Sequence, residues 1–138
     1  MKHFKAYEVV DKNTYEALGE DALRLFPDHS LLMLDGLREF FDVPITVNTW
    51  HSGGQFQWRG FRTIHCKEGA KQSYHRRGMA FDCDVRNYTA EEARKKILSN
   101  EDDPLLQYVN RIEDGVNWLH IDSGTVPEGK QRIYLFKA

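Results

Sequence analysis

The chain has 138 residues, of which 41% are hydrophobic and 29% are charged, and its formal net charge is −2. This length predicts a single domain over residues 1–138 with its own hydrophobic core. So small a net charge argues against binding to nucleic acid through bulk electrostatics. No apolar run is long enough to span a membrane, and the first residues lack the apolar segment of a signal peptide, so we expect a cytoplasmic protein. We also expect it to be a monomer. Cys66 and Cys83 form no CxxC pair and are expected to be reduced packing residues.

The first quarter of the chain predicts a helix. Residues 4–10 have only a weak pattern, which fits a short strand or an extended arm. Apolar side chains at helical spacing then predict a helix over residues 15–26, and Asn13 or Thr14 can serve as its N-cap.

A second helix, a strand and a long loop are predicted next. An apolar stripe predicts a second helix that Asp28 or Ser30 caps and that ends before Pro44. Alternating residues 45–50 then predict a strand. The stretch 51–72 has neither pattern, and a loop of this length in a compact domain is either functional or disordered. Its aromatic and arginine side chains argue against disorder, so we expect a functional loop.

The second half of the chain predicts a sheet with one inserted helix. In a strand over residues 79–85, alternate residues including Asp82 share one face, and the apolar residues share the other. Thr89 and Glu92 form the pattern of a capping box for a helix over 89–100. Helices first and strands afterwards indicate the α+β class. The remaining predicted elements are a hairpin turn at Asp114–Gly115, a strand over 116–122 and a strand over 133–136.

Three residues of the second half form a candidate metal site. His75 and Asp82 lie seven residues apart with Gly78 between them, and His120 follows thirty-eight residues after Asp82. Two imidazoles and one carboxylate are a ligand set for a catalytic zinc, which keeps a fourth position for water. We expect His75 in a loop, where Gly78 allows a turn or a close backbone approach, and the other two ligands on strands. The expected cofactor is therefore Zn²⁺.

These residues belong to a longer pattern, S-x-H-x-x-G-x-A-x-D followed by W-x-H. It is formed by Ser73, His75, Gly78, Ala80, Asp82, Trp118 and His120. This pattern resembles the signature of the zinc D-alanyl-D-alanine carboxypeptidases and related peptidoglycan endopeptidases, which share their fold with the Hedgehog signalling domain. The match extends from about Pro44 to the C-terminus. The resemblance implies N-terminal helices packed on a small, mainly antiparallel sheet, with the two histidines and the aspartate of the pattern as zinc ligands.

The resemblance also implies residues that bind substrate. In the family, an arginine after a strand holds the carboxylate of the substrate, and Arg62 is the best counterpart here, with Arg59 second. A guanidinium suits this task because it can bind a carboxylate through two hydrogen bonds. Ser73 and Trp118, two further positions of the pattern, are assigned to the substrate-binding side.

The proton acceptor is where the chain departs from the family. Many of its carboxypeptidases place a glutamate three residues before the last histidine, and Asn117 occupies that position here. If Asp114–Gly115 is a two-residue turn, Glu113 pairs with Val116. If the loop covers residues 114–117, Glu113 pairs with Trp118, and in both cases it shares the face of His120. We therefore expect Glu113 to be the general base, with Asp114 as the second candidate.

Two classes of function follow. The first is zinc-dependent hydrolysis of a peptide bond in bacterial peptidoglycan, of the D-Ala-D-Ala carboxypeptidase or the L-Ala-D-Glu endopeptidase type. The small size and the lack of a signal peptide resemble phage or prophage enzymes, which reach the wall through a holin, a tail or lysis. The alternative is a catalytically inactive zinc-binding protein of the same fold, which Asn117 favours.

Overall fold

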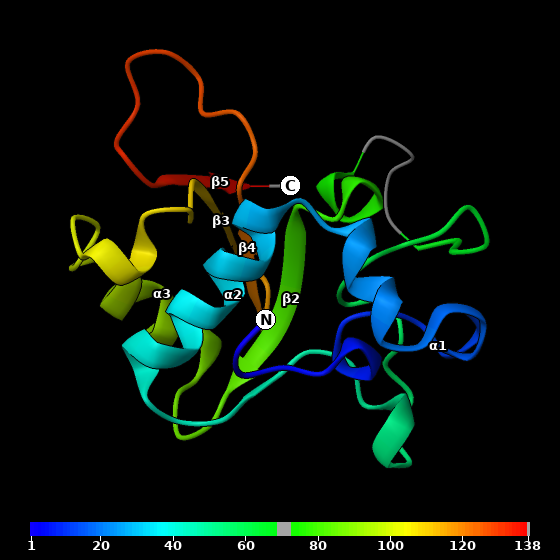
Figure 1. Ribbon diagram of the computed structural model, residues 1–138. Helices are drawn as coiled ribbons and strands as arrows, with labels where there is room; N and C mark the ends of the chain where they lie inside the picture. The colour runs from blue at the N-terminus through cyan, green and yellow to red at the C-terminus, as the bar shows by residue number, and fades with distance from the viewer. Residues whose placement is uncertain (69–72, 138) are drawn as a thin grey trace.

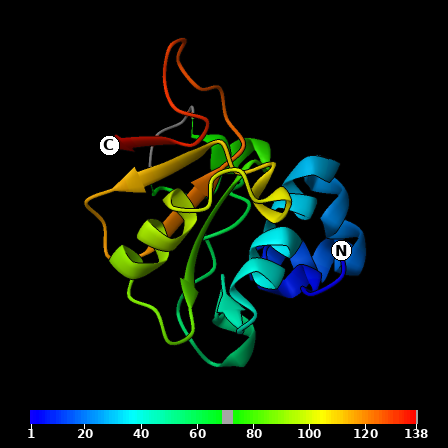
Figure 2. The same cartoon turned by 90° about the vertical axis from the view of Figure 1, so that its left-hand side faces the viewer.

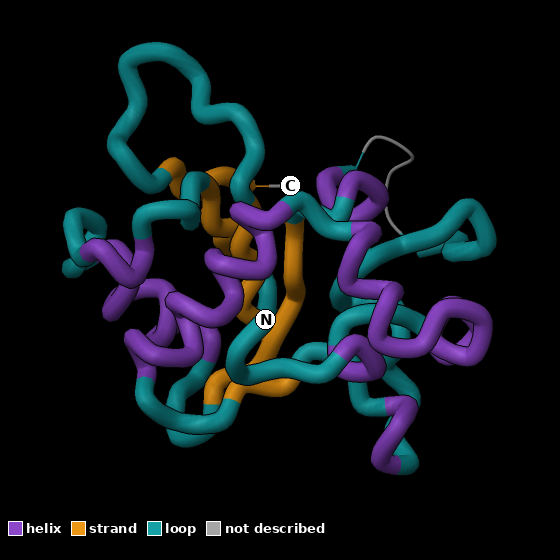
Figure 3. Tube along the Cα trace, viewed as in Figure 1, coloured by secondary structure: helices purple, strands orange, loops and turns teal. Residues whose placement is uncertain are grey.

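The computed structural model describes residues 1–68 and 73–137 (Figures 1 and 3). The α-helices in this part of the chain are α1 (Lys12–Leu18), α2 (Asp28–Phe41) and α3 (Ala90–Leu98). The 3-10 helices are η1 (Ala6–Glu8), η2 (Gly19–Leu25), η3 (Trp50–Ser52), η4 (Tyr74–Arg77) and η5 (Pro104–Leu106). The strands are β1 (Ile45–Thr46), β2 (Ala80–Val85), β3 (Arg111–Asp114), β4 (Leu119–Asp122) and β5 (Tyr134–Lys137). The predicted α+β class is therefore confirmed. None of the described helices is long and apolar enough to cross a membrane.

The strands form one mixed sheet in the order β1-β2-β4-β3-β5. Three of its pairs are antiparallel, and β5 pairs with β3 in parallel. The long β4–β5 connection passes over one end of the sheet and brings β5 back beside β3 (Figures 1 and 2). The sheet is thus mainly antiparallel, as expected, with a parallel edge that the sequence pattern did not indicate.

One face of the sheet packs against the helices, and the other face carries Asp82. Phe81 and Cys83 of β2 are fully buried and belong to the core, which also takes in Leu34 and Leu37 of α2 and Ile97 of α3. Full burial of one large apolar side chain is worth about 1.5–3 kcal/mol, so this face holds the helices against the sheet. The predicted alternation along the strand places Asp82 on the opposite face, away from the helices.

The N-terminal segment differs from the prediction. Residues 4–10 contain the short helix η1 and no strand, and the helix predicted over 15–26 is divided into α1 and η2. The division occurs at Gly19, whose φ of 59° is incompatible with a continuing right-handed helix. Asp11, not Asn13 or Thr14, caps α1, because its side chain accepts a hydrogen bond from the backbone of Thr14.

The second and third helices agree with the sequence patterns. α2 covers Asp28–Phe41 and ends before Pro44, but neither Asp28 nor Ser30 is its N-cap: Pro27 occupies that position, and no side chain caps the helix. The buried hydroxyl of Ser30 has no partner among the described residues. α3 begins after Thr89, which exchanges the two hydrogen bonds of a capping box with Glu92.

Two strands are shorter than predicted. β1 ends at Thr46 because the chain then turns toward the N-terminal segment, where the indole nitrogen of Trp50 donates to the carbonyl of Val10 at 2.8 Å. β4 begins at Leu119, so the hairpin loop covers residues 115–118 instead of turning at Asp114–Gly115. The loop is held from α3, since Arg94 donates to the carbonyl oxygens of Val116 and Trp118. This long-range contact holds the loop in the position that it occupies.

Candidate metal centre

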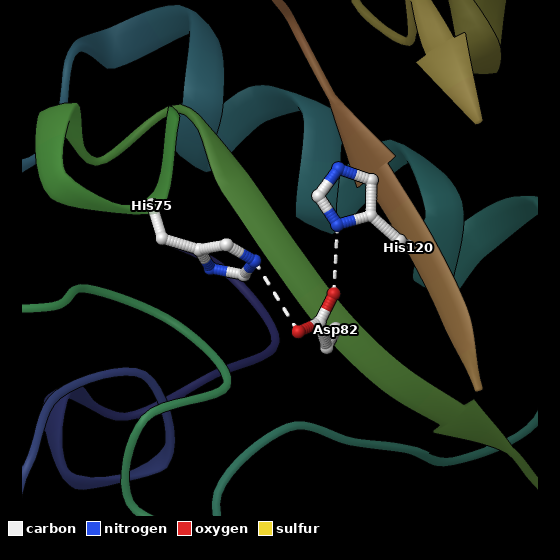
Figure 4. A group of neighbouring side chains, drawn as sticks. All are labelled: His75, Asp82 and His120. Atoms are coloured by element: carbon white, nitrogen blue, oxygen red, sulfur yellow. Dashed lines mark hydrogen bonds and ion pairs between the residues drawn. The ribbon is translucent and has the colours of Figure 1, made fainter. Parts of the chain in front are cut away.

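The segment before β2 fixes the position of His75. The Oγ of Ser73 accepts a hydrogen bond from the backbone nitrogen of His75 at 3.2 Å, which caps η4. Gly78 ends η4 with a φ of 67°, and a Cβ at this position would lie 2.9 Å from the carbonyl oxygen of Leu25. Both properties predicted for Gly78, the turn and the close backbone approach, are confirmed. His75 is buried as a result, and its ring points at β2 (Figure 4).

Asp82 and His120 face each other on neighbouring strands. They are directly opposite in the β2–β4 ladder, and Oδ1 of Asp82 lies 2.8 Å from Nδ1 of His120. The other carboxylate oxygen, Oδ2, lies 3.3 Å from Nε2 of His75 (Figure 4). All three residues are buried, and one ligand atom from each lies within 4.8 Å of the others. The structure therefore brings together the three predicted ligands as a group that could hold a metal ion.

The remaining nitrogen of each ring has a partner that suits metal binding. Nδ1 of His75 lies 2.9 Å from the carbonyl oxygen of Gly60, which can only accept, so Nδ1 carries a proton and Nε2 is the nitrogen that can bind a metal ion. Nε2 of His120 lies 2.8 Å from Oδ2 of Asp122, which leaves Nδ1 as the ligand atom. Metal-binding histidines usually donate their other N–H to a carbonyl or carboxylate in this way. The donor set therefore fits a metal ion.

Gly60 can reach His75 because it has no side chain. A Cβ on Gly60 would collide with the carbonyl oxygen of Val9. The neighbouring backbone adds two more contacts: Arg62 donates its backbone N–H to the carbonyl of His75 at 3.2 Å, and Asp82 donates to the carbonyl of Arg59 at 2.7 Å. The loop predicted to be functional is thus tied to both η4 and β2.

The carboxylates of the group favour a charged imidazole. Burial opposes ionisation of Asp82, but its hydrogen bonds with His120 and His75 outweigh this and hold the pKa of Asp82 well below its usual range. Burial likewise disfavours the imidazolium of His120, but the carboxylates of Asp122 and Asp82 outweigh it and raise the pKa of His120 to about 9. A metal ion at Nδ1 of His120 must therefore displace a firmly held proton.

Of the two arginines considered for substrate, Arg62 lies beside the metal group. Its Nη2 donates to Oδ2 of Asp82 at 3.3 Å, its Nε donates to the carbonyl of Trp58 at 2.7 Å, and its side chain is 11% exposed. Arg59 instead binds Asp84 through both terminal nitrogens, at 2.8 and 3.4 Å.

A cleft of about 450 Å³ adjoins the group. Asp82 belongs to its lining, together with Arg62, Arg59 and, from the hairpin loop, Asn117 and Trp118. The buried Nε1 of Trp118 has no hydrogen-bond partner among the described residues. An unpaired buried donor is costly, and Trp118 is the residue of the cleft that carries one. Ser73 is used as a helix cap and does not appear among the lining residues.

The two candidate bases lie on opposite faces of the sheet. Arg111 pairs with Asp122 and Ile112 with Ile121, so the next pair in this register is Glu113 with His120. Glu113 therefore shares the face of His120, as predicted, although its partner is neither Val116 nor Trp118. Asp114 points the other way, and its carboxylate lies 3.9 Å from Nε of Arg94 on α3. Asp114 therefore lies on the face of the sheet opposite to the metal group.

Three residues near the group were not identified from the sequence. Asp122 is two residues from His120 on the same strand, so the alternation of β4 could have revealed it. Arg111 binds Asp122 across the sheet, at 2.9 Å from Nε to Oδ1. Glu68 lines the cleft from the loop, and no local pattern marks it. The last two depend on contacts between distant parts of the chain.

Comparison of this chain with protein-family models, curated proteins and solved structures found no match. The geometry of the site and the pattern of its residues are therefore what support a function.

Proposed function

We propose that this protein is a zinc peptidase that hydrolyses a peptide bond in the crosslinks or precursors of bacterial peptidoglycan. The observation that carries the proposal is the convergence of Nε2 of His75, a carboxylate oxygen of Asp82 and Nδ1 of His120 beside a cleft. The resemblance of the same residues to the D-Ala-D-Ala carboxypeptidase and L-Ala-D-Glu endopeptidase signature supplies the substrate class.

The three residues would hold the metal through two nitrogens and one oxygen, the donor set of catalytic zinc sites. Zinc in such a site supplies a position for water and lowers the pKa of that water to about 7. The chain contributes the orientation of the ligands, because the carbonyl of Gly60 and the carboxylate of Asp122 set which ring nitrogen is free.

Arg62 and Trp118 are the groups proposed to bind the peptide. The Nη2 of Arg62 is 3.3 Å from Asp82, so a substrate carboxylate bound by Arg62 would lie next to the metal group. Arg62 also keeps its Nε on the carbonyl of Trp58, which limits the rotation of the guanidinium. The unpaired indole N–H of Trp118 would donate to a carbonyl of the peptide.

Peptide hydrolysis needs a group that takes a proton from the attacking water and gives it to the departing amine. Glu113 is one candidate, because it follows in the register opposite His120. Glu68 is the other, because it lines the same cleft as Asp82 and forms no ion pair with the described residues. Asn117 lines the cleft too but accepts no proton.

A second function is supported by Asn117. If neither glutamate reaches the attacking water, the same centre binds zinc without hydrolysis, and the protein is a zinc-stabilised binding protein. Both proposals require the metal, and only the first requires turnover.

The deciding experiment incubates purified cell wall with the zinc-loaded protein and identifies the released ends by mass spectrometry. New amino and carboxyl ends that disappear after chelation and return with zinc would support the peptidase. The His75→Ala variant controls for a contaminating hydrolase. A protein that binds zinc but releases nothing from any wall peptide would overturn the peptidase and favour the binding protein.

A further inference from the structure

Asp122 is the most enclosed charged residue near the metal group. Its side chain has no solvent exposure, and three donors surround it. Nε2 of His120 lies 2.8 Å from Oδ2, whereas Nε of Arg111 and the backbone nitrogen of Gly124 lie 2.9 and 3.0 Å from Oδ1. The two oxygens therefore have different partners: Oδ2 accepts from His120 alone, and Oδ1 accepts from Arg111 and Gly124.

Two aromatic rings hold the guanidinium of Arg111 in the position from which it donates to Asp122. Its guanidinium lies 4.1 Å from the ring centroid of Phe136 and 5.0 Å from that of Tyr74. Phe136 is on β5, whose parallel pairing with β3 brings it to this side of the sheet, and its ring also contacts that of His120 edge-on. Stacking against aromatic rings orients a guanidinium.

Gly124 is the second fixed donor. A Cβ at this position would collide with the ring of Tyr74, so the backbone lies against that ring and has no room to shift. The next residue, Thr125, donates its backbone N–H to the hydroxyl of Tyr74 at 3.2 Å. Tyr74 is thus packed against Arg111 and Gly124, the two donors to Oδ1 of Asp122.

We propose that Asp122 sets the metal-binding form of His120 and that Arg111 and Gly124 hold its carboxylate in place. Both are donors only, so they demand an oxygen at Oδ1. The remaining oxygen then accepts from Nε2 of His120 and leaves Nδ1 for the metal. In this account Arg111 is a positioning residue that acts through Asp122. The inference rests on the proposed metal centre and does not depend on peptide hydrolysis.

Asparagine at position 122 is the informative change. Its single oxygen would be drawn to Arg111 and Gly124, which turns its amide nitrogen toward His120. That nitrogen donates, so Nε2 of His120 must become the acceptor and the proton moves to Nδ1. The nitrogen that should bind the metal is then blocked, although the shape of the side chain is unchanged.

The test compares zinc affinity by chelator competition in the wild type, Asp122→Asn and the double variant Arg111→Met with Asp122→Asn. Loss of a residue that orients a ligand typically costs 10–100-fold in metal affinity, and we expect Asp122→Asn to lose about 100-fold. Removal of Arg111 leaves Gly124 as the one remaining donor to this oxygen among those described, which lowers the cost of turning the asparagine oxygen toward His120, so the double variant should recover about tenfold. A purely structural role of Asp122 predicts no such rescue.

Equal affinity in the wild type and Asp122→Asn would overturn the inference, as would a double variant that binds no better than the single one. Arg111→Met alone retains a carboxylate at position 122 and should change zinc affinity by less than about tenfold. A loss as large as that of Asp122→Asn would show that Arg111 supports the fold instead.

A measurement on the wild type tests the inference even if the variants fail to fold. In the protein loaded with an NMR-active cadmium isotope, scalar coupling to the metal should appear at Nδ1 of His120, with the proton on Nε2. Coupling at Nε2 would overturn the inference even if cadmium binds fully. Absence of any coupling to His120 would reject the metal centre itself, a result distinct from the loss of hydrolysis.

Discussion

His120 lies between two carboxylates: its Nδ1 is 2.8 Å from Oδ1 of Asp82, and its Nε2 is 2.8 Å from Oδ2 of Asp122. Both nitrogens can donate at once only when the ring is protonated. These contacts account for the raised pKa of His120, about 9, and they link metal binding to pH.

Zinc binding should release protons at neutral pH. Because the pKa of His120 is raised to about 9, the ring is charged at pH 7 without metal and must lose its Nδ1 proton to become a ligand. The apparent zinc affinity should therefore rise with pH until about 9 and then level off. Calorimetry at pH 7 in buffers of different ionisation enthalpy should detect about one proton or more per zinc. Heats that do not depend on the buffer would contradict this.

His120→Ala should lose bound zinc. The change removes one of three protein ligands, so metal analysis after purification without chelator should fall from about one equivalent to a small fraction. His65→Ala is the matched control, because His65 is an exposed loop histidine outside the group. Equal zinc content in the wild type and His120→Ala would reject the ligand assignment.

Arg62→Lys should weaken catalytic efficiency. Lysine keeps the charge but loses the planar fork, including the Nε donor to Trp58 and the Nη2 donor to Asp82. Loss of one charge-assisted hydrogen bond, worth about 1.5–3 kcal/mol, corresponds to roughly a 10–100-fold lower kcat/KM. Zinc content should be unchanged. If Arg62→Lys is silent and Arg59→Lys is not, Arg59 is the residue that binds the carboxylate.

Glu113→Gln and Glu68→Gln should separate the two candidate bases. Each change keeps the size of the side chain and removes the proton acceptor. The variant that lacks the base should lose about 10²–10⁴-fold in turnover with zinc still bound. The other variant should keep most of its activity. Full activity in both variants, and in their combination, would exclude both glutamates from the proton transfer.

Gly78→Ala should destabilise the protein more than Gly129→Ala. Both glycines have positive φ, 67° and 80°, so alanine at either position incurs a cost of about 1–2 kcal/mol. Only at Gly78 would the new Cβ also press on the backbone, 2.9 Å from the carbonyl oxygen of Leu25, whereas nothing lies within 4 Å at Gly129. Urea denaturation measures the difference. Equal losses would mean that the close approach is unimportant.

Local patterns in the sequence were sufficient for the elements that position the ligands. The alternation of β2 placed Asp82 opposite the buried Phe81, the capping box of Thr89 started α3, and Gly78 marked the turn after His75. These features depend on residues within a few positions of each other. His75 and Asp82 belong to one such short motif, whereas His120 lies thirty-eight residues after Asp82 and reaches it through the pairing of β2 with β4.

The tertiary structure alone decided the surroundings of that group. Arg94 on α3 donates to two carbonyl oxygens of the hairpin loop, and the pairing of β3 with β4 places Glu113 on the face of His120. The parallel pairing of β5 brings Phe136 against Arg111, and the long loop brings Glu68 to the cleft. Each of these contacts joins segments that are distant in the chain. These contacts form only in the folded protein, because the two residues of each contact are far apart in the sequence.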